Sequence, residues 1–414
     1  MTASKPSLTE RLKSLGVELG AQDLAARPKN KFPIDQVVDG EILATSLGES
    51  FVWERLYPFE HVHGSAPLKM AAPMDMLAAW GRDERIATSG HRAFAYLDTE
   101  TTGLATGSGT YAFLIGVGRF EEEGFRLAQF FMRDPAEEPA QLALLEEFLS
   151  PCEIVVTFNG KSFDVPLLNV RYTTHGIRSP LSNSAHLDLL HLARRLWRQR
   201  LPSRALGDLE VAILGHARTE EDVPGWMIPQ LYFDYLSSGD ARPMQGVLYH
   251  NAEDILSMVA LLNQMAGMLA EPLEGSVEHA EDMVAIGRLY EDLGYQDQAA
   301  RIMERSLEGE LPQSLATQTM ERLAVLHRRR GDITAALSLW YQAAADSEVY
   351  AHVELAKHYE HRERKLDEAL RWTQAALAIV NMPGYPKLER FQWMDQLTHR
   401  LLRLERRLKK HDLK

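Results

Sequence analysis

The chain has 414 residues, of which 45% are hydrophobic and 25% are charged, a composition typical of globular proteins with two or three domains. Lysine and arginine total 45 against 58 acidic residues, and the formal net charge of −13 argues against coating nucleic acid or anionic membranes through bulk charge. The single cysteine, Cys152, excludes a disulfide framework and a cysteine-based zinc finger. No segment resembles a signal peptide or a membrane span, so we expect a cytoplasmic protein with no membrane partner.

The charge is unevenly distributed along the chain. Most of the excess negative charge lies in residues 91–270, yet residues 171–204 within that block contain seven arginines and one acid, Asp188. The middle of the protein is therefore divided into an acidic part and a compact arginine-rich part.

Residues 1–90 form an N-terminal region to which the sequence assigns no role. We expect a short helix over Leu8–Leu19 and strands over Val37–Thr45 and Ser50–Tyr57. His61 and His63 lie two residues apart and could reach one metal ion from an extended backbone. No cysteine lies near them in the sequence, and we expect surface histidines.

Residues 91–270 alternate between short apolar runs and segments with helical spacing. The predicted strands are Ala93–Leu97, Ala112–Phe120, Phe125–Met132 and Glu153–Phe158. The predicted helices are Pro139–Leu149, Val165–Tyr172, Leu187–Trp197, Ala205–Leu214 and Gln245–Met268. Three strands, a helix, a strand and then helices indicate a mixed sheet covered by helices.

Residues 275–414 have no strand signal and contain recurring helical segments. The small residues Ala299, Ala336 and Ala369 recur at intervals near the roughly 34-residue period of tetratricopeptide helix pairs. A small residue at such a position lets two helices approach closely. A plain helical bundle is the alternative, and the basic amphipathic helix 391–409 is expected to be the solvated cap of the array.

Two acids, Asp98 and Glu100, stand at the end of the first predicted strand of the middle region. They occur in Leu97-Asp98-Thr99-Glu100-Thr101-Thr102-Gly103-Leu104. Because side chains alternate along a strand, both carboxylates face one side, where they can share a divalent cation.

Two further sequence blocks contain acids that, taken alone, do not indicate a functional site. Asp164 follows Asn159 by five residues at a strand-to-helix junction, where an aspartate is usually a helix N-cap. His250 and Asp254 are four residues apart on a predicted helix and therefore share a face.

Taken together and in this order, the three blocks resemble the exonuclease motifs of the ribonuclease H-like DEDD superfamily. Within it, the chain looks most like the bacterial ribonuclease H-like domain with a C-terminal tetratricopeptide region. Supporting segments are Gly207-Asp208-Leu209-Glu210, Val223-Pro224-Gly225-Trp226-Met227-Ile228-Pro229 and His250-Asn251-x-x-Asp254. The resemblance implies an α/β fold: a ribonuclease H-like mixed sheet flanked by helices over residues 91–270, followed by an all-α tetratricopeptide-like domain over residues 275–414.

The resemblance also implies a chemistry. Asp98, Glu100, Asp164 and Asp254 would be catalytic ligands for two Mg²⁺ or Mn²⁺ ions that support phosphodiester hydrolysis. The implied activity is that of a 3′–5′ exonuclease acting on single-stranded or fraying DNA or RNA ends. One alternative is a structure-specific endonuclease that uses the same carboxylates. The other is a catalytically inactive scaffold, and the presence of all four acids argues against that second alternative.

The identity of the general base departs from the superfamily pattern. Tyrosine stands four residues before the last aspartate in one version of the pattern, and histidine five before in the other. Here His250 stands at four and Tyr249 at five. We expect His250 to be the base, because it shares a helix face with Asp254 and an imidazole can accept a proton near neutral pH. Tyr249 is expected to have a packing role. The alternative is a site in which neither His250 nor Tyr249 is the base.

Contacts to nucleic acid follow from the same motifs. The glycine-rich loop 105–110 lacks the lysine and spacing of a P-loop and is expected to be a flexible turn near the 3′ end. Candidates for binding the terminal nucleotide are Thr99, Thr101, Gly103, Asn159 and Phe163, and candidates for the phosphate backbone are Arg194, Arg195 and Arg198. For the arginines, a solvated helix face paired with acids is the alternative. The helical repeats suggest a protein partner.

Overall fold

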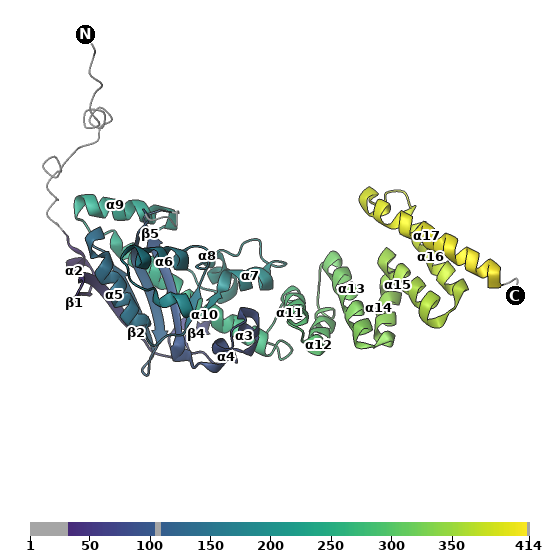
Figure 1. Cartoon of the computed structure of the whole chain (residues 1–414), viewed down its shortest axis with the longest axis horizontal. Coiled ribbons are helices and arrows are strands. Elements are labelled where there is room, and N and C mark those ends of the chain that lie inside the picture. Colours follow the sequence, from purple (N-terminus) through teal and green to yellow (C-terminus); the bar gives the residue numbers. More distant parts are fainter. Residues whose placement is uncertain (1–31, 104–108, 412–414) are drawn as a thin grey trace, which may run out of the picture. The chain divides into compact units, whose positions relative to one another are not determined.

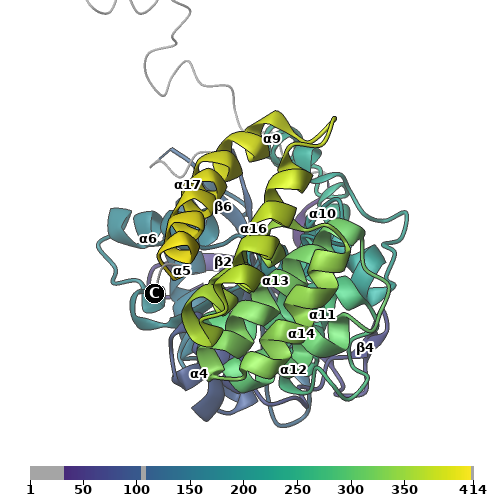
Figure 2. The same ribbon diagram turned by 90° about the vertical axis from the view of Figure 1, so that its right-hand side faces the viewer.

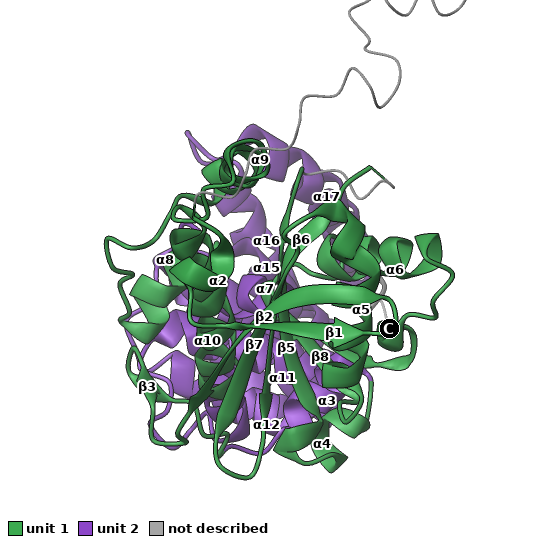
Figure 3. Cartoon of the chain, turned by 90° about the vertical axis from the view of Figure 1, so that its left-hand side faces the viewer, with its two compact units in different colours: residues 1–71, 83–190, 205–264 green, residues 72–82, 191–204, 265–414 purple. Residues whose placement is uncertain are grey.

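The computed structural model describes residues 32–103 and 109–411, so the predicted helix at 8–19 and most of loop 105–110 lie outside the described residues. The chain consists of two compact units (Figures 1 and 3). Among the described residues, the first contains 32–71, 83–103, 109–190 and 205–264, and the second contains 72–82, 191–204 and 265–411. Within the described ranges, no helix combines the length and apolar character needed to cross a bilayer.

A seven-stranded mixed sheet forms the centre of the first unit. Its order is β1 (Glu41–Thr45), β2 (Gly48–Tyr57), β7 (Phe125–Phe131), β6 (Ala112–Phe120), β5 (Phe94–Thr101), β8 (Ile154–Thr157) and β9 (Ala185–Asp188). Pairs from β1 to β5 are antiparallel, whereas β5, β8 and β9 are parallel. A separate hairpin pairs β3 (Val62–His63) with β4 (Ala66–Pro67). The predicted mixed sheet is confirmed.

Helices cover both faces of this sheet. The principal helices are α5 (Glu138–Leu149), α6 (Asp164–Thr174), α9 (Ile228–Ser238) and α10 (Met244–Ala270), whose last residues belong to the second unit. Shorter elements are α2 (Ile34–Val37), α4 (Arg85–Thr88), α8 (Leu206–Leu209), η1 (His91–Ala93), η2 (Pro135–Glu137), η3 (Pro180–Asn183), the π-turn η4 (Glu210–Leu214) and η5 (Gly225–Met227). One hydrophobic cluster joins α5 and α6 to strand residues such as Ile115, and another joins α9 and α10 to its neighbour Leu114. Because side chains alternate between the two faces of the sheet, β6 contributes to an apolar layer on each face.

The structure differs from the sequence prediction in several elements. Residues 185–188 form β9, so the helix predicted over 187–197 begins only at Leu189. A four-residue strand is too short for its alternation to identify it, and its pairing with β8 decides its conformation. Helix α9 was not predicted. Strands β1 and β2 extend the central sheet, so the structure has no break at residue 90.

The second unit is helical. It contains α3 (Asp75–Gly81), most of α7 (Leu189–Trp197), α11 (Ala280–Asp292), α12 (Gln296–Ser306), α13 (Gln313–Arg330), α14 (Ile333–Ala345), α15 (Val349–His358), the π-turn η6 (Tyr359–Glu363), α16 (Leu366–Val380) and α17 (Lys387–His411). From α11 onward each helix packs against the next (Figures 1 and 2). Ala299, Ala336 and Ala369 are fully buried on α12, α14 and α16, the second helix of each successive pair. The predicted helical C-terminal region is confirmed.

A candidate active site on one face of the sheet

Asp98 and Glu100 lie within β5, because the strand continues to Thr101 rather than ending before the acids. Asp98 is opposite Gly116 and Glu100 is opposite Leu114 on β6. Their spacing by two residues directs both carboxylates to the same face of the sheet. That face is the one covered by α10, since Asn251 Nδ2 donates to Asp98 Oδ2 at 2.8 Å.

A buried amide pair holds Asp98. Asn251 and Gln129 are almost completely buried, and Gln129 Nε2 donates at 2.8 Å both to Asn251 Oδ1 and to the carbonyl of Leu248. A Cβ added at Gly116 would lie 2.0 Å from Asn251 Oδ1, so a glycine is needed where α10 crosses β6. Gln129 gave no signal in the sequence, and Asn251 appeared only as part of a motif.

Asp164 is the first residue of α6 and is buried. Thr99 Oγ1 donates a hydrogen bond to Asp164 Oδ1, which joins the start of α6 to β5. The preceding loop is fixed by Asp188 at the end of β9, whose carboxylate accepts from the backbone N–H groups of Asn159 at 2.8 Å and Lys161 at 3.0 Å. Asn159 has a positive φ of 69°, a conformation that asparagine tolerates better than most residues. Asp188 therefore sets the position from which Asp164 projects.

Asp254 and His250 project from α10, with His250 Nε2 3.7 Å from Asp254 Oδ2. Arg218, which was not predicted, forms an ion pair with Asp254 Oδ1 and binds Glu210 through two contacts of 2.6 and 2.8 Å. Its other terminal nitrogen lies 3.1 Å from His250 Nδ1. Arg218 is thus the nearest cation to the last carboxylate of the set.

Asp222 orients His250. Its Oδ1 lies 2.7 Å from His250 Nδ1, a better hydrogen-bond distance than the contact with Arg218. A neutral imidazole that donates Nδ1–H to Asp222 keeps the lone pair of Nε2 on the side of Asp254. Tyr249 has a separate contact, since the backbone N–H of Thr219 donates to its hydroxyl at 3.2 Å.

The carboxylates share an electrostatic environment that disfavours negative charge. Burial, reinforced by the neighbouring carboxylates, raises the pKa values of Asp98 and Glu100 well above their usual range. Burial raises the pKa of Asp164 to about 6 despite the hydrogen bond from Thr99. Burial also raises the pKa of Asp254, although Arg218 and His250 oppose it. Such a site gains stability from bound cations.

The donor set fits divalent cations that prefer oxygen ligands. Glu100, His250 and Asp254 each offer a ligand atom, and these atoms lie within 4.8 Å of one another. Asp164 and Asp254 each raise the pKa values of both Asp98 and Glu100 through space, as expected for carboxylates gathered in one site. Carboxylate oxygens are the ligands of Mg²⁺ and Mn²⁺.

The predicted nucleotide contacts are distributed unevenly around this site. Thr99 is bonded to Asp164, and Thr101 Oγ1 donates to the Gly103 carbonyl at 2.8 Å. Phe163, directly before Asp164, leaves 46% of its surface exposed. The structure does not bring the three predicted arginines into this unit. Arg194, Arg195 and Arg198 belong to the helical unit, where Arg195 pairs with Asp292 and the other two are exposed.

The expectation that His63 is a surface histidine is wrong. Its side chain is almost completely buried, and its Nε2 lies 2.7 Å from Ser257 Oγ. His216 and Glu253 lie beside it, although they are about 150 residues or more away in the chain. No local pattern near residue 63 could have revealed partners at such a sequence separation.

In comparisons with known proteins, a family model of the RNase H superfamily matches residues 95–266. Uncharacterized protein YprB of Bacillus subtilis (strain 168) is 32% identical over 336 residues, which cover 78% of this chain and 79% of that protein. Among solved structures, the family B DNA polymerase of the archaeon Pyrobaculum calidifontis aligns with a TM-score of 0.32 and 14% identity. That alignment covers 49% of this chain and 29% of the polymerase, and it does not establish a common fold.

Proposed function

This chain belongs to the family of protein YprB and carries an RNase H superfamily domain, and we propose that it is a metal-dependent nuclease hydrolysing phosphodiester bonds. The convergence of four carboxylates from β5, α6 and α10 carries the proposal. Asp98, Glu100, Asp164 and Asp254 would hold two Mg²⁺ or Mn²⁺ ions. When bound, such ions activate a water molecule and stabilise the leaving 3′-oxygen.

His250 is the general base in this proposal. Asp222 fixes its tautomer by accepting the Nδ1 proton, so Nε2 is the atom that would take the proton of the attacking water. The 3.7 Å between Nε2 and Asp254 Oδ2 places this nitrogen at the edge of the carboxylate cluster. Asp222 acts through His250 and is a positioning residue.

We infer a 3′–5′ exonuclease acting on single-stranded or fraying ends. Phe163 supports this substrate, because an exposed aromatic ring next to a catalytic carboxylate offers a stacking surface for an unpaired terminal base. A duplex keeps its bases stacked and would not present that face. Asn159 would contribute through the loop that Asp188 holds in place.

The test uses 5′-labelled single-stranded DNA and RNA, incubated with the full chain in Mg²⁺, in Mn²⁺ or in EDTA. A ladder of shortened labelled products that requires metal is expected, and Asp98→Asn should abolish it. The exposed Asp208 provides a matched control, so Asp208→Asn should retain the activity. The proposal fails if the wild type shows no metal-dependent cleavage or if Asp98→Asn retains it.

A second substrate separates exonuclease from endonuclease action. An oligonucleotide with a blocked 3′ end should resist a 3′–5′ exonuclease. Internal fragments released from it would replace the exonuclease assignment by a structure-specific endonuclease that uses the same carboxylates.

We also infer that α11–α17 form a tetratricopeptide-like array that binds a protein partner. Burial of a small residue in the second helix of three successive pairs supports this interpretation. Such arrays present extended surfaces to peptides or proteins. Crosslinking of the full chain in its own cells, followed by mapping of crosslinked peptides, should identify α11–α17 as the contact region.

A further inference from the structure

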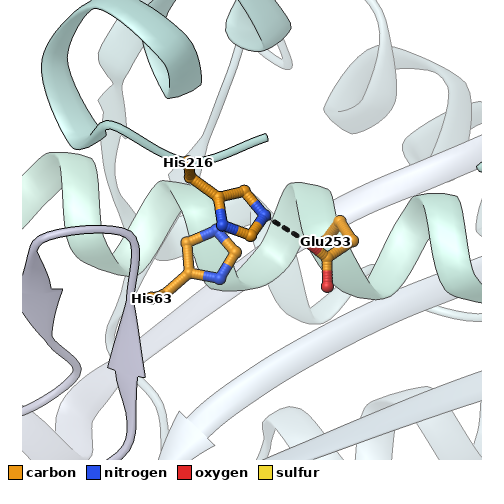
Figure 4. A group of neighbouring side chains, drawn as sticks. All are labelled: His63, His216 and Glu253. Carbon is orange, nitrogen blue, oxygen red and sulfur yellow. Dashed lines mark hydrogen bonds and ion pairs between the residues drawn. The ribbon is translucent and has the colours of Figure 1, made fainter. Parts of the chain in front are cut away.

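A second group of metal-ligating side chains lies apart from the four carboxylates. His63 comes from β3, His216 follows the π-turn η4, and Glu253 lies on α10 (Figure 4). One ligand atom of each residue lies within 4.8 Å of the other two. His216 Nε2 is 2.6 Å from Glu253 Oε2, and the centroids of the two imidazole rings are 4.0 Å apart. Three side chains from distant segments thus converge on one point.

The backbone around these histidines is built to hold them together. Gly64 has a positive φ of 63°, and a Cβ added there would lie 2.3 Å from the carbonyl oxygen of Leu214. The next residue, Ser65, donates its N–H to that same oxygen at 2.7 Å. On the other side, the N–H of His216 donates to the carbonyl of Glu210 at 2.9 Å. The β3–β4 hairpin and the π-turn are therefore joined by a hydrogen bond that lies two residues from each histidine.

Hydrogen bonding fixes the tautomer of His63. Ser257 Oγ donates its proton to Glu210 Oε1 at 2.7 Å, and the same oxygen lies 2.7 Å from His63 Nε2. The hydroxyl proton is therefore not available for a hydrogen bond to His63. The hydroxyl oxygen must then accept from Nε2–H, which leaves Nδ1 of His63 with its lone pair. Metal-binding histidines commonly donate their other ring N–H to a fixed acceptor in this way. Burial keeps the ring neutral, since it lowers the pKa of His63 to about 3.

We propose that His63, His216 and Glu253 form a zinc site separate from the carboxylates of the proposed nuclease centre. Two imidazoles and one carboxylate are a donor set that suits Zn²⁺, whereas Mg²⁺ prefers oxygen ligands alone. Ligand atoms around a tetrahedral Zn²⁺ lie roughly 3.3 Å apart, which small side-chain rotations reach from the present spacing. The ion would replace the proton shared by His216 and Glu253, and its fourth position would be left to water.

The ion would have a structural role. Its three ligands join the β3–β4 hairpin, the segment after η4 and α10, which are also connected by the hydrogen bonds described above and by an apolar cluster of Ala66, Leu214 and Ala260. Glu253 immediately precedes Asp254 on α10, so the ion would also fix the helix that carries two residues of the candidate active site. An ion bound at this position would stabilise the part of the fold that holds α10.

Zinc binding by the untagged full chain tests this proposal. The protein is stripped with a chelator and titrated with Zn²⁺ against a chromophoric chelator, in millimolar Mg²⁺ to occupy the carboxylates. The bound metal is then counted by elemental mass spectrometry after gel filtration. We expect one equivalent with submicromolar affinity, and at least a 100-fold loss of affinity in His63→Gln and in His216→Gln.

Two controls locate the ion. Asp254→Asn removes a ligand of the proposed nuclease centre, and His399→Gln removes an exposed histidine on α17. Both should keep the equivalent of zinc. The proposal is overturned if the wild type binds no tight equivalent, if the histidine variants bind it as well as the wild type, or if Asp254→Asn alone loses it.

A further variant keeps the proposal testable if the histidine variants fail to fold. Glu253→Gln keeps the size of the side chain and both rings, and should weaken Zn²⁺ binding at least 10-fold. Co²⁺ gives an independent readout, because tetrahedral coordination produces intense visible absorption bands. These bands should be present in the wild type and weakened in Glu253→Gln, and an unchanged spectrum would contradict the site. None of these readouts depends on nuclease activity.

Discussion

Replacing Asp164 by asparagine is expected to stabilise the metal-free protein while weakening its binding of divalent ions. Asp164 is buried at the start of α6, and burial raises its pKa to about 6 from an ordinary value of 3.8. The hydrogen bond from Thr99 favours the charged form but does not offset the burial. The folded chain without metal therefore carries a carboxylate in an unfavourable place.

The sign follows from proton linkage. A carboxyl group with a raised pKa binds its proton more tightly in the folded chain than in the unfolded chain. Its contribution to stability is complete below about pH 4 and is lost as the pH rises through 6. A difference of about two pKa units corresponds to roughly 3 kcal/mol above pH 7. The amide of Asp164→Asn never ionises, so the variant escapes this loss and can still accept from Thr99.

The assay is urea unfolding in EDTA at pH 4, 6 and 7.5, followed by hydrogen exchange in peptides of β5 and α6. Relative to wild type, Asp164→Asn should gain up to about 3 kcal/mol of stability between pH 4 and 7.5. The control Asp208→Asn should follow the wild type. Millimolar Mg²⁺ should stabilise the wild type more than Asp164→Asn. A stability difference that does not change with pH, or that favours the wild type at pH 7.5 in EDTA, would refute the reasoning.

Three other substitutions test separate parts of the structure. His250→Ala should lower the cleavage rate by about 10²–10⁴ at saturating metal, whereas Tyr249→Phe should leave it within a few-fold, and the reverse result would reassign the base. Gly116→Ala would place a Cβ 2.0 Å from Asn251 Oδ1, so it should lower the free energy of unfolding by about 1–3 kcal/mol. The melting temperature and the cleavage rate should both fall. An unchanged melting curve would show that α10 can shift freely. Burial alone would raise the pKa of Glu360, but its arginine partners lower it below the ordinary value of 4.5. The contact therefore stabilises the helical unit at neutral pH, and this contribution is progressively lost as the pH falls below 4.5. Glu360→Gln should therefore destabilise α15–α17 by roughly 1–3 kcal/mol at pH 7 and by less at pH 4, measured by hydrogen exchange.

Local spacing was sufficient to predict the parts of the site that lie within one element. Asp98 and Glu100 share a face because strand side chains alternate, and His250 and Asp254 share one because helix residues four apart do. Both relationships hold in the structure. The period of the alanines likewise located helix contacts in the C-terminal region, because a small residue marks a close approach whichever helix faces it.

Residues that act through tertiary contacts were not predictable from spacing. Arg218 reaches Asp254 from a loop 36 residues away, and Asp222 reaches His250 from the same loop. The segment has no periodicity, and an arginine in a polar loop is usually solvated. His63 shows the same limit more strongly, since its partners come from an unrelated turn and from α10. A sequence motif identifies which groups can do chemistry, and the fold decides which of them meet.

The structure also changes the meaning of the acidic balance of −13. Part of the arginine-rich stretch that the sequence offered for phosphate binding is used inside the helical unit, where Arg195 pairs with Asp292 and Arg200 with Asp282. Fewer cations are then left to neutralise phosphates, and binding through arginines alone would have a shallow salt dependence. The carboxylates, in contrast, concentrate negative charge where the proposed ions would bind. In the proposed nuclease, the affinity for nucleic acid would therefore depend more on the concentration of divalent metal than on that of salt. This dependence is expected of a protein that binds one end of a strand and does not coat it.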